Sequence, residues 1–340
     1  MWLALVLCAT PLRAESLRIA FWNVELNRQG PGLLLRDVLR GDDPQIAAII
    51  TVLGQLDADV LVLTGVDYDL GQQALSALAD LSAKGGQPYP HRFALAPNAG
   101  VPTGFDLDGD GKTGGPRDAM GYGRFAGEGG MAVLSRLPID TPAVRNYSTF
   151  LWRDLPGAMM PPDMPPEVAA LQRLASNAQW DVPVILRDGR ALHLLTWHAT
   201  PPVFDGPEDR NGRRNHDEAA FWVQLINGDL PFAAPDSPFM IIGQSNLDPD
   251  HGDGLPDAMQ ALLTHRALQD PSPKGAQGTA TADFTARNGP GYLRSDVILP
   301  SADLRVTGAG VMWPADGYPD LATLQTASRH RPVWVEVWVD

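Results

Sequence analysis

The stretch FMIIGQSN, residues 239–246, decides the fold of this chain more than any other segment. Four apolar residues lead into Gly243, and the polar residues Gln244, Ser245 and Asn246 follow at once. A short apolar run that ends in polar side chains is typical of a buried strand that brings its last residues to a surface site. If that site held a metal ion, an acidic residue would be expected in place of Gln244. The stretch therefore predicts a buried strand and leaves open whether the site at its end is active.

Other segments have the same form, an apolar or alternating run followed by polar residues. They are residues 17–25, 59–67, 130–136, 182–187, 192–200, 295–301 and 331–339. Helical periodicity separates some of them, at residues 43–56, 70–83, 215–226 and 256–268. In the first of these helices we expect Asp43 to cap the first turn and Pro44 to occupy it. Many strands with few helices predict two packed sheets flanked by helices.

The composition is that of a globular, acidic protein. Of 340 residues, 44% are hydrophobic and 19% are charged, which permits a large core in one large domain or two smaller ones. Because no clear linker or internal repeat is visible, we expect one domain over residues 15–340. The formal net charge of −14 repels phosphate backbones and disfavours non-specific nucleic-acid binding.

The first 14 residues, MWLALVLCATPLRA, are predicted to be a signal peptide. Residues 2–7 form a short apolar run, and residues 12–14 resemble a signal-peptidase site. The run is too short to span a membrane, and a buried first strand is the alternative. Cleavage would remove Cys8, the only cysteine, and would leave a mature chain without disulfides. We therefore expect a secreted or periplasmic protein.

The richest polar segment is TWHATPPVFDGPEDRNGRRNHDE, residues 196–218. His198 ends a predicted strand, and two prolines then make the exit of that strand rigid. A histidine in such a position either packs in the core or belongs to a functional site. The dense polar loop after His198 makes a functional site as good an interpretation as a core histidine. Arg213, in the same loop, is a candidate for binding an anionic substrate.

Polar residues also lie at the ends of other predicted strands. Asp296 is near the start of segment 295–301, and His330 precedes the last strand. An aspartate that orients a histidine is the usual arrangement for a general base, because the carboxylate fixes the tautomer and stabilises the imidazolium. Asn23 and Glu25, in the motif FWNVE, end the first strand and are a weak signal by themselves.

Six motifs follow one another along residues 17–339: FWNVE, GMAVLSR, the strand of His198, IIGQSNLDP, RSDVILPS and SRHRPVWVEV. Their order resembles that of the endonuclease/exonuclease/phosphatase superfamily, which includes DNase-I-like nucleases, inositol-phosphate phosphatases and sphingomyelinases. The resemblance implies an α/β fold, a four-layer α/β/β/α sandwich of two packed mixed β-sheets flanked by helices. It also implies metal-assisted phosphoester hydrolysis with Mg²⁺ or Mn²⁺.

The resemblance also assigns roles to residues of this chain. It makes His330 the general base, with Asp296 to orient it. It makes His198 and Asn246 hydrogen-bond donors to the transition state, and it makes Asn23 a positioning residue. Glu25 would be a weak remnant of the ancestral metal site.

The departures from the superfamily fall on its metal site. Gly65, Gln244 and Arg329 stand where the superfamily has acidic metal ligands, so the formal charge of these positions changes from −3 to +1. Hard divalent cations need oxygen anions, and a nearby Arg would oppose them by several kcal/mol. Asn177 and Gln179 replace a Lys and a His in the same way. We therefore expect the usual Mg²⁺ site to be absent or very weak.

A separate candidate for metal binding is the loop DLDGDGKTGG, residues 106–115. Asp106, Asp108 and Asp110 have the spacing of a Ca²⁺ loop, with a glycine in the sixth position. The closing carboxylate is missing, because position twelve is Arg117 and Asp118 comes one residue later. A structural Ca²⁺ site and a solvated Asp-Gly turn are both open.

Three functions compete on these residues. The first is a binding or scaffold protein without catalysis, in which Arg329, Gln244 and Arg213 hold a small phosphorylated or anionic ligand. The second is a working phosphoesterase whose metal site has been rebuilt from acids such as Glu25, Asp67 and Asp248. The third, a metal-free esterase, lacks a visible Gly-x-Ser-x-Gly nucleophile.

Overall fold

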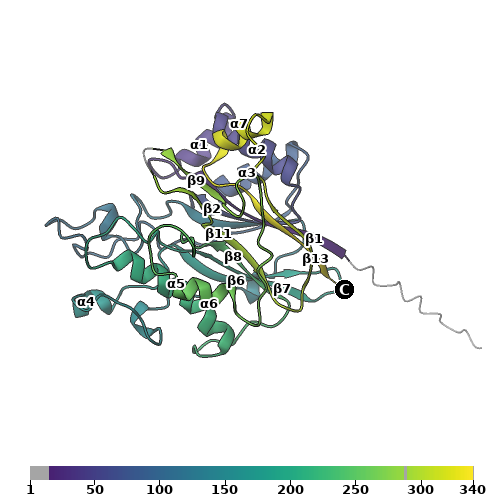
Figure 1. Cartoon of the computed structure of the whole chain (residues 1–340). Helices are drawn as coiled ribbons and strands as arrows, with labels where there is room; N and C mark the ends of the chain where they lie inside the picture. Colours follow the sequence, from purple (N-terminus) through teal and green to yellow (C-terminus); the bar gives the residue numbers. More distant parts are fainter. Residues whose placement is uncertain (1–14, 287–288, 340) are drawn as a thin grey trace, which may run out of the picture.

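Two β-sheets form the centre of the molecule (Figure 1). The computed structural model describes residues 15–286 and 289–339, and the predicted signal peptide with Cys8 lies outside these residues. The first sheet contains, in order, β12 (Arg305–Val311), β13 (Val333–Val339), β1 (Glu15–Leu26), β2 (Val60–Val66), β4 (Gly130–Ser135) and β3 (His91–Phe93). Strands β1 and β2 are parallel and the other neighbours are antiparallel, so this sheet is mixed.

The second sheet is also mixed. It contains, in order, β11 (Asp296–Pro300), β8 (Phe239–Gln244), β7 (Ala191–His198), β6 (Ala178–Ile185) and β5 (Arg145–Asn146). Strands β7 and β8 are parallel, and the other pairs are antiparallel. A separate hairpin of β9 (Ala282–Phe284) and β10 (Gly291–Leu293) precedes β11.

Helices cover the outer face of each sheet (Figure 1). The first sheet is covered by α1 (Leu33–Arg40), α2 (Pro44–Leu56), α3 (Gln73–Lys84) and α7 (Pro319–Ala327), and the second by α5 (Arg210–Asn227) and α6 (Asp257–Leu263). Short helices lie in connecting segments: α4 (Pro166–Ala169) and the 3₁₀ turns Pro116–Asp118, Thr141–Ala143 and Trp152–Asp154. Within the described residues, no helix combines the length and the apolar character that a membrane span needs.

Three apolar layers hold these elements together. The layer between the sheets includes Ile19, Val62, Leu194 and Ile242, all fully buried, and a separate cluster lies under the helices of each sheet. Alternate residues of a strand face opposite sides, so one set of strands can supply both an inner and an outer cluster. This arrangement confirms the predicted four-layer α/β/β/α sandwich.

Helix α2 shows how the sequence specifies one of these elements. The Asp43 side chain accepts hydrogen bonds from the backbone nitrogens of Gln45 and Ile46, and Pro44 occupies the first turn. The cap satisfies donors that a helix start leaves unpaired. Ile49 and Leu53 then bury the apolar face against the first sheet, so the predicted cap and face of this helix are confirmed.

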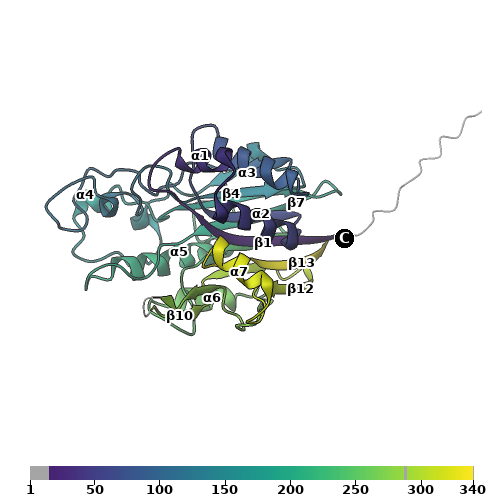
Figure 2. The ribbon, with the colours of Figure 1, turned by 90° about the horizontal axis from the view of Figure 1, so that it is seen from above.

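The direction of the strands decides where the site lies. In Figure 2, β1 and β13 run side by side. Their pairing begins with Glu15 opposite Val339, so the start of β1 and the end of β13 lie at the same end of the first sheet. Asn23 lies toward the other end of β1, where the parallel strand β2 also ends. In the second sheet, β7 and β8 end together at His198 and Gln244. The polar ends of both sheets therefore meet at one edge of the sandwich.

Candidate active site

The site is built on the inner faces of the two sheets, at the edge where their strands end. His198 is paired with Gln244, and Gln244 is paired with Asp296, across three neighbouring strands. Paired residues of adjacent strands point to the same face, so these three side chains form a row. Asn23 reaches Gln244 from the opposite sheet. The structure thus brings together His198, Gln244, Asp296 and Asn23.

His330 joins this row through Asp296. Its Nδ1 lies 2.9 Å from Asp296 Oδ2, and the side chains are only 3% and 1% exposed. Trp22 Nε1 donates to the His330 carbonyl at 3.0 Å, and the Phe284 ring packs edge-on against the imidazole at 5.5 Å. Burial lowers the pKa of His330, but the charge and hydrogen bond of Asp296 outweigh it, so the pKa is raised overall. With Nδ1 bound to Asp296, Nε2 is the nitrogen left for proton transfer.

His198 has the opposite character. Burial, together with the nearby charge of His330, lowers the pKa of His198 to about 3, so this imidazole is neutral at physiological pH. Its Nδ1 is buried and makes no hydrogen bond among the described residues. The surroundings of the two histidines therefore shift their pKa values in opposite directions, down for His198 and up for His330. Such a difference is what acid–base chemistry uses when it occurs in an active site.

Gln244 is held in a network of uncharged side chains. Its Oε1 accepts hydrogen bonds from Asn23 Nδ2 at 2.7 Å and from Thr64 Oγ1 at 3.1 Å. Its Nε2 donates to Asn246 Oδ1 at 2.6 Å, and Asn246 Nδ2 donates to the carbonyl of Ala199 at 2.8 Å. Because both ends of the amide are engaged, Gln244 would have to break these bonds to become a metal ligand.

Gly65 does more than remove a side chain from the site. Its φ of +71° is in the left-handed region that only glycine adopts readily. A Cβ at this position would overlap the Asn23 Oδ1 atom and would lie 2.9 Å from the Glu25 nitrogen. The register of β2 with both β1 and β4 shifts at the same place. The backbone here has a shape that leaves no room for the acidic ligand of the superfamily.

Glu25 and Arg329 bind each other at the rim of the site. The Glu25 carboxylate accepts from Arg329 Nε at 2.8 Å, from Arg329 Nη2, from the Arg329 backbone nitrogen at 2.7 Å and from Ser328 Oγ at 3.1 Å. Burial raises the pKa of Glu25, but the hydrogen bonds from Arg329 and the charges of His330 and Arg329 lower it overall. The carboxylate is therefore ionised and already fully bonded.

These contacts test whether a divalent cation fits the ancestral position. Gly65 offers no ligand, Gln244 is a neutral amide with both ends bonded, and Glu25 is neutralised by the cation Arg329. A hard cation needs several anionic oxygens, and it would here meet a guanidinium within the same group of side chains. The residues present at this position do not fit Mg²⁺ or Mn²⁺.

The acids suggested for a rebuilt metal site have other partners. Asp67 accepts from the backbone nitrogens of Arg28 and Gly129, at 2.8 and 2.9 Å. Asp248 accepts from the backbone of Asp250 at 2.9 Å and of Arg294 at 2.8 Å. Both carboxylates hold loops in place by satisfying backbone donors. Within residues 15–286 and 289–339, neither belongs to a group of three potential ligands.

Helix α5 supplies a buried polar network beside the site that the sequence did not predict. Glu218, fully buried, accepts from the backbone nitrogen of Ser176 at 2.6 Å, from its hydroxyl at 2.7 Å and from the Thr200 nitrogen at 2.7 Å. Thr200 follows the strand of His198 by two residues. Burial raises the pKa of Glu218 to about 7 and lowers that of its neighbour Arg214 to about 10. Glu218 thus fixes the strand end that carries His198.

Arg213 is not brought to the site by any described contact. Its Nε donates to the Glu208 carbonyl at 3.1 Å, on the exposed side of the loop. Its neighbour Arg214 points inward and donates to backbone carbonyls, including those of Leu174 and Met120. Asn177 and Gln179 are buried, and their amide nitrogens donate to the carbonyls of Gly129 and Glu218. The arginine-rich segment is therefore mainly a structural clamp, and substrate binding by Arg213 stays a prediction.

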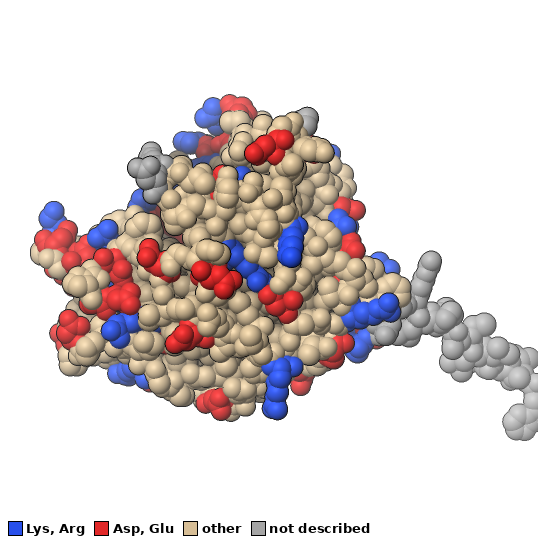
Figure 3. Space-filling view, in the orientation of Figure 1, with Lys and Arg blue, Asp and Glu red and all other residues tan. Residues whose placement is uncertain are grey.

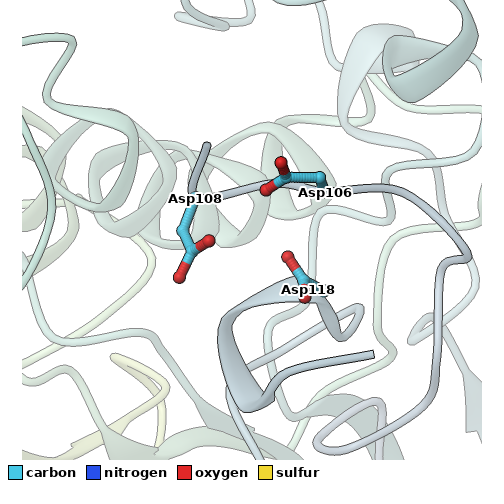
Figure 4. A group of neighbouring side chains, drawn as sticks. All are labelled: Asp106, Asp108 and Asp118. Atoms are coloured by element: carbon cyan, nitrogen blue, oxygen red, sulfur yellow. The ribbon is translucent and has the colours of Figure 1, made fainter. Parts of the chain in front are cut away.

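The predicted Ca²⁺ loop has a different set of acids from the one expected. Asp106, Asp108 and Asp118 each place a carboxylate oxygen within 4.8 Å of the others. Figure 4 shows these three side chains beside one another. Asp110 lies outside this group, and its Oδ1 accepts from the Lys112 nitrogen at 2.8 Å, so a ligand role for Asp110 stays a prediction. The charges of Asp108 and Asp118 also act on the nearby guanidinium of Arg210, which opposes a cation. Ca²⁺ at this triad stays a prediction.

The surface shows the same acidic character as the composition. In Figure 3, acidic side chains gather on the left of the visible face, on the side where Figure 1 shows α4 and the start of α5. Basic side chains are scattered among apolar and uncharged ones rather than collected in a stripe on this face. A polyanion would find no continuous basic track here, in line with the net charge of −14.

Comparison with known proteins agrees with this architecture. The model of the Endonuclease/Exonuclease/phosphatase family matches residues 20–330. No curated protein matches the sequence. An endonuclease/exonuclease/phosphatase from Beutenbergia cavernae is similar in structure, with a TM-score of 0.57 and 18% identity over 95% of this chain and 71% of that one.

Two other similar structures have more specific names. A mannosyl-6-phosphatase from Bacteroides thetaiotaomicron has a TM-score of 0.53 and 16% identity, over 94% of this chain and 99% of that one. A sphingomyelinase C from Streptomyces griseocarneus has a TM-score of 0.52 and 17% identity, over 95% and 99%. At such identities the likeness concerns the fold alone. Since the family model spans most of the sequence and the structure has the corresponding fold, the chain belongs to the endonuclease/exonuclease/phosphatase family.

Proposed function

We propose that this protein binds a small phosphorylated or otherwise anionic ligand at the site, and that metal-dependent phosphoester hydrolysis is weakened or lost. The observation that supports this most strongly is the pair of Glu25 and Arg329. The Arg329 guanidinium is bonded to Glu25, the acid that the sequence offered as a remnant of the metal site. A site that held a divalent metal would keep that carboxylate free for the ion.

The charge and the donors of the site favour an anion. The guanidinium of Arg329 is positively charged, and its side chain is 62% exposed. The charge and hydrogen bond of Asp296 raise the pKa of His330 despite its burial, which favours the charged form of the imidazole. Guanidinium groups bind phosphate and carboxylate with paired, charge-assisted hydrogen bonds and need no metal. Two proteins of similar fold are named a mannosyl-6-phosphatase and a sphingomyelinase C. A ligand with a phosphate group is consistent with both comparisons.

The alternative is an active phosphodiesterase or phosphatase, and the intact His330–Asp296 pair favours it. That pair has the geometry of an oriented general base, at 2.9 Å. What the alternative needs in addition is a metal or another group to stabilise the phosphoryl charge. Under our proposal the protein keeps the His330–Asp296 pair but lacks the metal, or another group, that would stabilise the phosphoryl charge.

Turnover assays decide between the two. Purified protein is tested on p-nitrophenyl phosphate and bis-p-nitrophenyl phosphate with Mg²⁺, Mn²⁺ or Ca²⁺, beside the variant His330→Ala. We expect that none of these metal ions raises the turnover of the wild type above that of His330→Ala, because the ligands for the metal are missing. Metal-stimulated turnover that His330→Ala abolishes would overturn the proposal in favour of the active enzyme. Binding of phenyl phosphate in the presence of EDTA, measured by calorimetry, tests the ligand itself.

A further inference from the structure

The anion-binding group of the proposed site is not free in this structure. The Glu25 carboxylate takes up both Nε and Nη2 of Arg329, and the backbone nitrogen of Arg329 as well. Among the contacts of residues 15–286 and 289–339, this leaves the Nη1 atom and one hydrogen of Nη2 for other acceptors. The formal charge of the pair is zero, so an incoming anion meets little net attraction until the two groups separate.

The guanidinium of Arg329 and the imidazole of His330 pack against the same aromatic ring. The Arg329 guanidinium carbon stacks over the Phe284 ring at 5.4 Å from its centroid, and the same ring lies 5.5 Å from the imidazole of His330. One aromatic side chain therefore separates the cation of the rim from the His330–Asp296 pair.

Two other charged side chains of the described residues near the pair, Arg331 and Asp283, are bonded to their neighbours. Arg331 is buried and donates to the carbonyl of Ser328, with its guanidinium stacked on Trp313. The Asp283 carboxylate accepts from the nitrogen and the hydroxyl of Thr285. By contrast, the Arg329 side chain is 62% exposed and the Glu25 side chain 20% exposed. Arg329 is thus the accessible cation of this group, and Glu25 is the carboxylate that holds it.

We propose that the Glu25 carboxylate is an internal competitor for Arg329, and that a phosphomonoester dianion displaces it to occupy the site. This inference rests on the proposed function, since it assumes that Arg329 is the group that binds the ligand. The carboxylate stands in for the ligand in the resting protein: it makes the paired, charge-assisted contacts that a phosphate would make. A ligand must therefore bind Arg329 more favourably than Glu25 does in order to displace it.

Charge and geometry make the phosphomonoester the ligand class that meets this threshold. The competing carboxylate carries one negative charge and has the advantage of being tethered, which acts as a high effective concentration. A phosphodiester also carries one charge, so it gains nothing over Glu25. A phosphomonoester near pH 7 carries a charge of about −1.5 to −2 and three acceptor oxygens, so it can replace the carboxylate and bind the remaining donors of Arg329.

The experiment compares charge-removing variants at matched positions. Glu25→Gln removes the competitor and keeps the size of the side chain, and Glu25→Asn is a second version that suits the positive φ of +49°. Glu336→Gln is the control, because Glu336 on β13 forms a similar carboxylate–guanidinium pair with Arg18 on β1, with both side chains 31% exposed. Arg329→Gln removes the cation. Melting curves establish that each variant is folded.

Calorimetric titrations with phenyl phosphate and diphenyl phosphate, in EDTA at pH 7.5, give the readout. We expect Glu25→Gln to bind phenyl phosphate about tenfold more tightly than the wild type, a gain of the size seen for one charge-assisted contact. We also expect it to reduce the preference for the monoester, whereas Glu336→Gln behaves like the wild type. If Glu25→Gln and Glu25→Asn bind no more tightly than the wild type, and binding still depends on Arg329, the idea that Glu25 competes with the ligand is wrong. The proposed function would still stand. Binding that is absent in all variants, or equal in Arg329→Gln, would overturn the proposed function as well.

Discussion

Gly65→Glu is expected to lower the free energy of unfolding by about 3 kcal/mol and not to restore a metal site. The variant restores an acid at one of the three positions, Gly65, Gln244 and Arg329, where the superfamily has acidic ligands, so it would be expected to repair part of a simple loss of ligands. The structure predicts the opposite, because φ at Gly65 is +71° and a Cβ would overlap Asn23 Oδ1. Gly65→Ala should cost nearly as much, since the overlap already arises at Cβ.

Urea denaturation of the two Gly65 variants measures this cost. Gly54→Glu is the matched control, because Gly54 lies in helix α2, where a Cβ would have no neighbouring atom within 4 Å. That variant should be as stable as the wild type or slightly more so, since Gly is a poor helix former. A Gly65→Glu protein with wild-type stability would show that the bulge in β2 adapts, and Mg²⁺-dependent activity in it would place the defect in the ligand alone.

Glu218→Ala is expected to lower the free energy of unfolding by about 3–5 kcal/mol. The substitution leaves the donors of Ser176 and Thr200 without their acceptor and leaves Arg214 as an uncompensated buried charge. Chemical denaturation measures the loss, with Glu208→Ala in the exposed loop as the control. A loss no larger than that of the control would show that the network of α5 does not support the site.

The same residue predicts a pH dependence of stability. The pKa of Glu218 is about 7 in the folded protein, above the ordinary value of 4.5, so the folded state holds a proton that the unfolded state has released. Its contribution to stability is therefore present at low pH and is lost as the pH rises from about 4.5 to about 7, by an amount on the order of 3 kcal/mol. His198 acts in the opposite direction below pH 6.5, since its pKa is lowered to about 3.

Comparison with Glu218→Gln at each pH isolates this contribution. The amide does not titrate, so the stability of the wild type should fall relative to that of the variant between pH 5 and pH 8, and His198 cancels from the difference. Parallel stability curves for the two proteins would contradict the assignment of the raised pKa to Glu218. Unfolding midpoints at a series of pH values are sufficient for the test.

The fold could be predicted from the sequence largely because each strand repeats one pattern. The apolar run ending at Gln244 became β8, and the cap and apolar face of α2 followed from ordinary helix chemistry. The start of β6 at Ala178 was missed, because the polar residues Asn177 and Gln179 look like a loop. They are buried instead, with their amides bonded to the carbonyls of Gly129 and Glu218. Such long-range satisfaction of polar groups is not visible in a local pattern.

The members of the site were predictable, but their contacts were not. The resemblance named His330, Asp296 and Gln244, and the structure brings them together. That Glu25 would accept four hydrogen bonds at Arg329 and Ser328 depends on two segments far apart in the sequence. The positive φ of Gly65 likewise depends on how β2 pairs with both of its neighbours. Helix α5 begins at Arg210, ahead of the predicted start at residue 215, because its polar first turn is bonded to the preceding loop.

A crystal soaked in millimolar Mn²⁺ tests the central claim, that the ancestral metal position is filled by side chains of the protein. Anomalous scattering locates Mn²⁺ directly, whatever the activity of the protein. We expect no anomalous peak among Asn23, Glu25, Gln244 and Asn246, and Glu25 should stay bonded to Arg329. A peak at Asp106, Asp108 and Asp118 would bear only on that separate triad. A Mn²⁺ ion ligated by Glu25, with Arg329 turned away, would contradict the account.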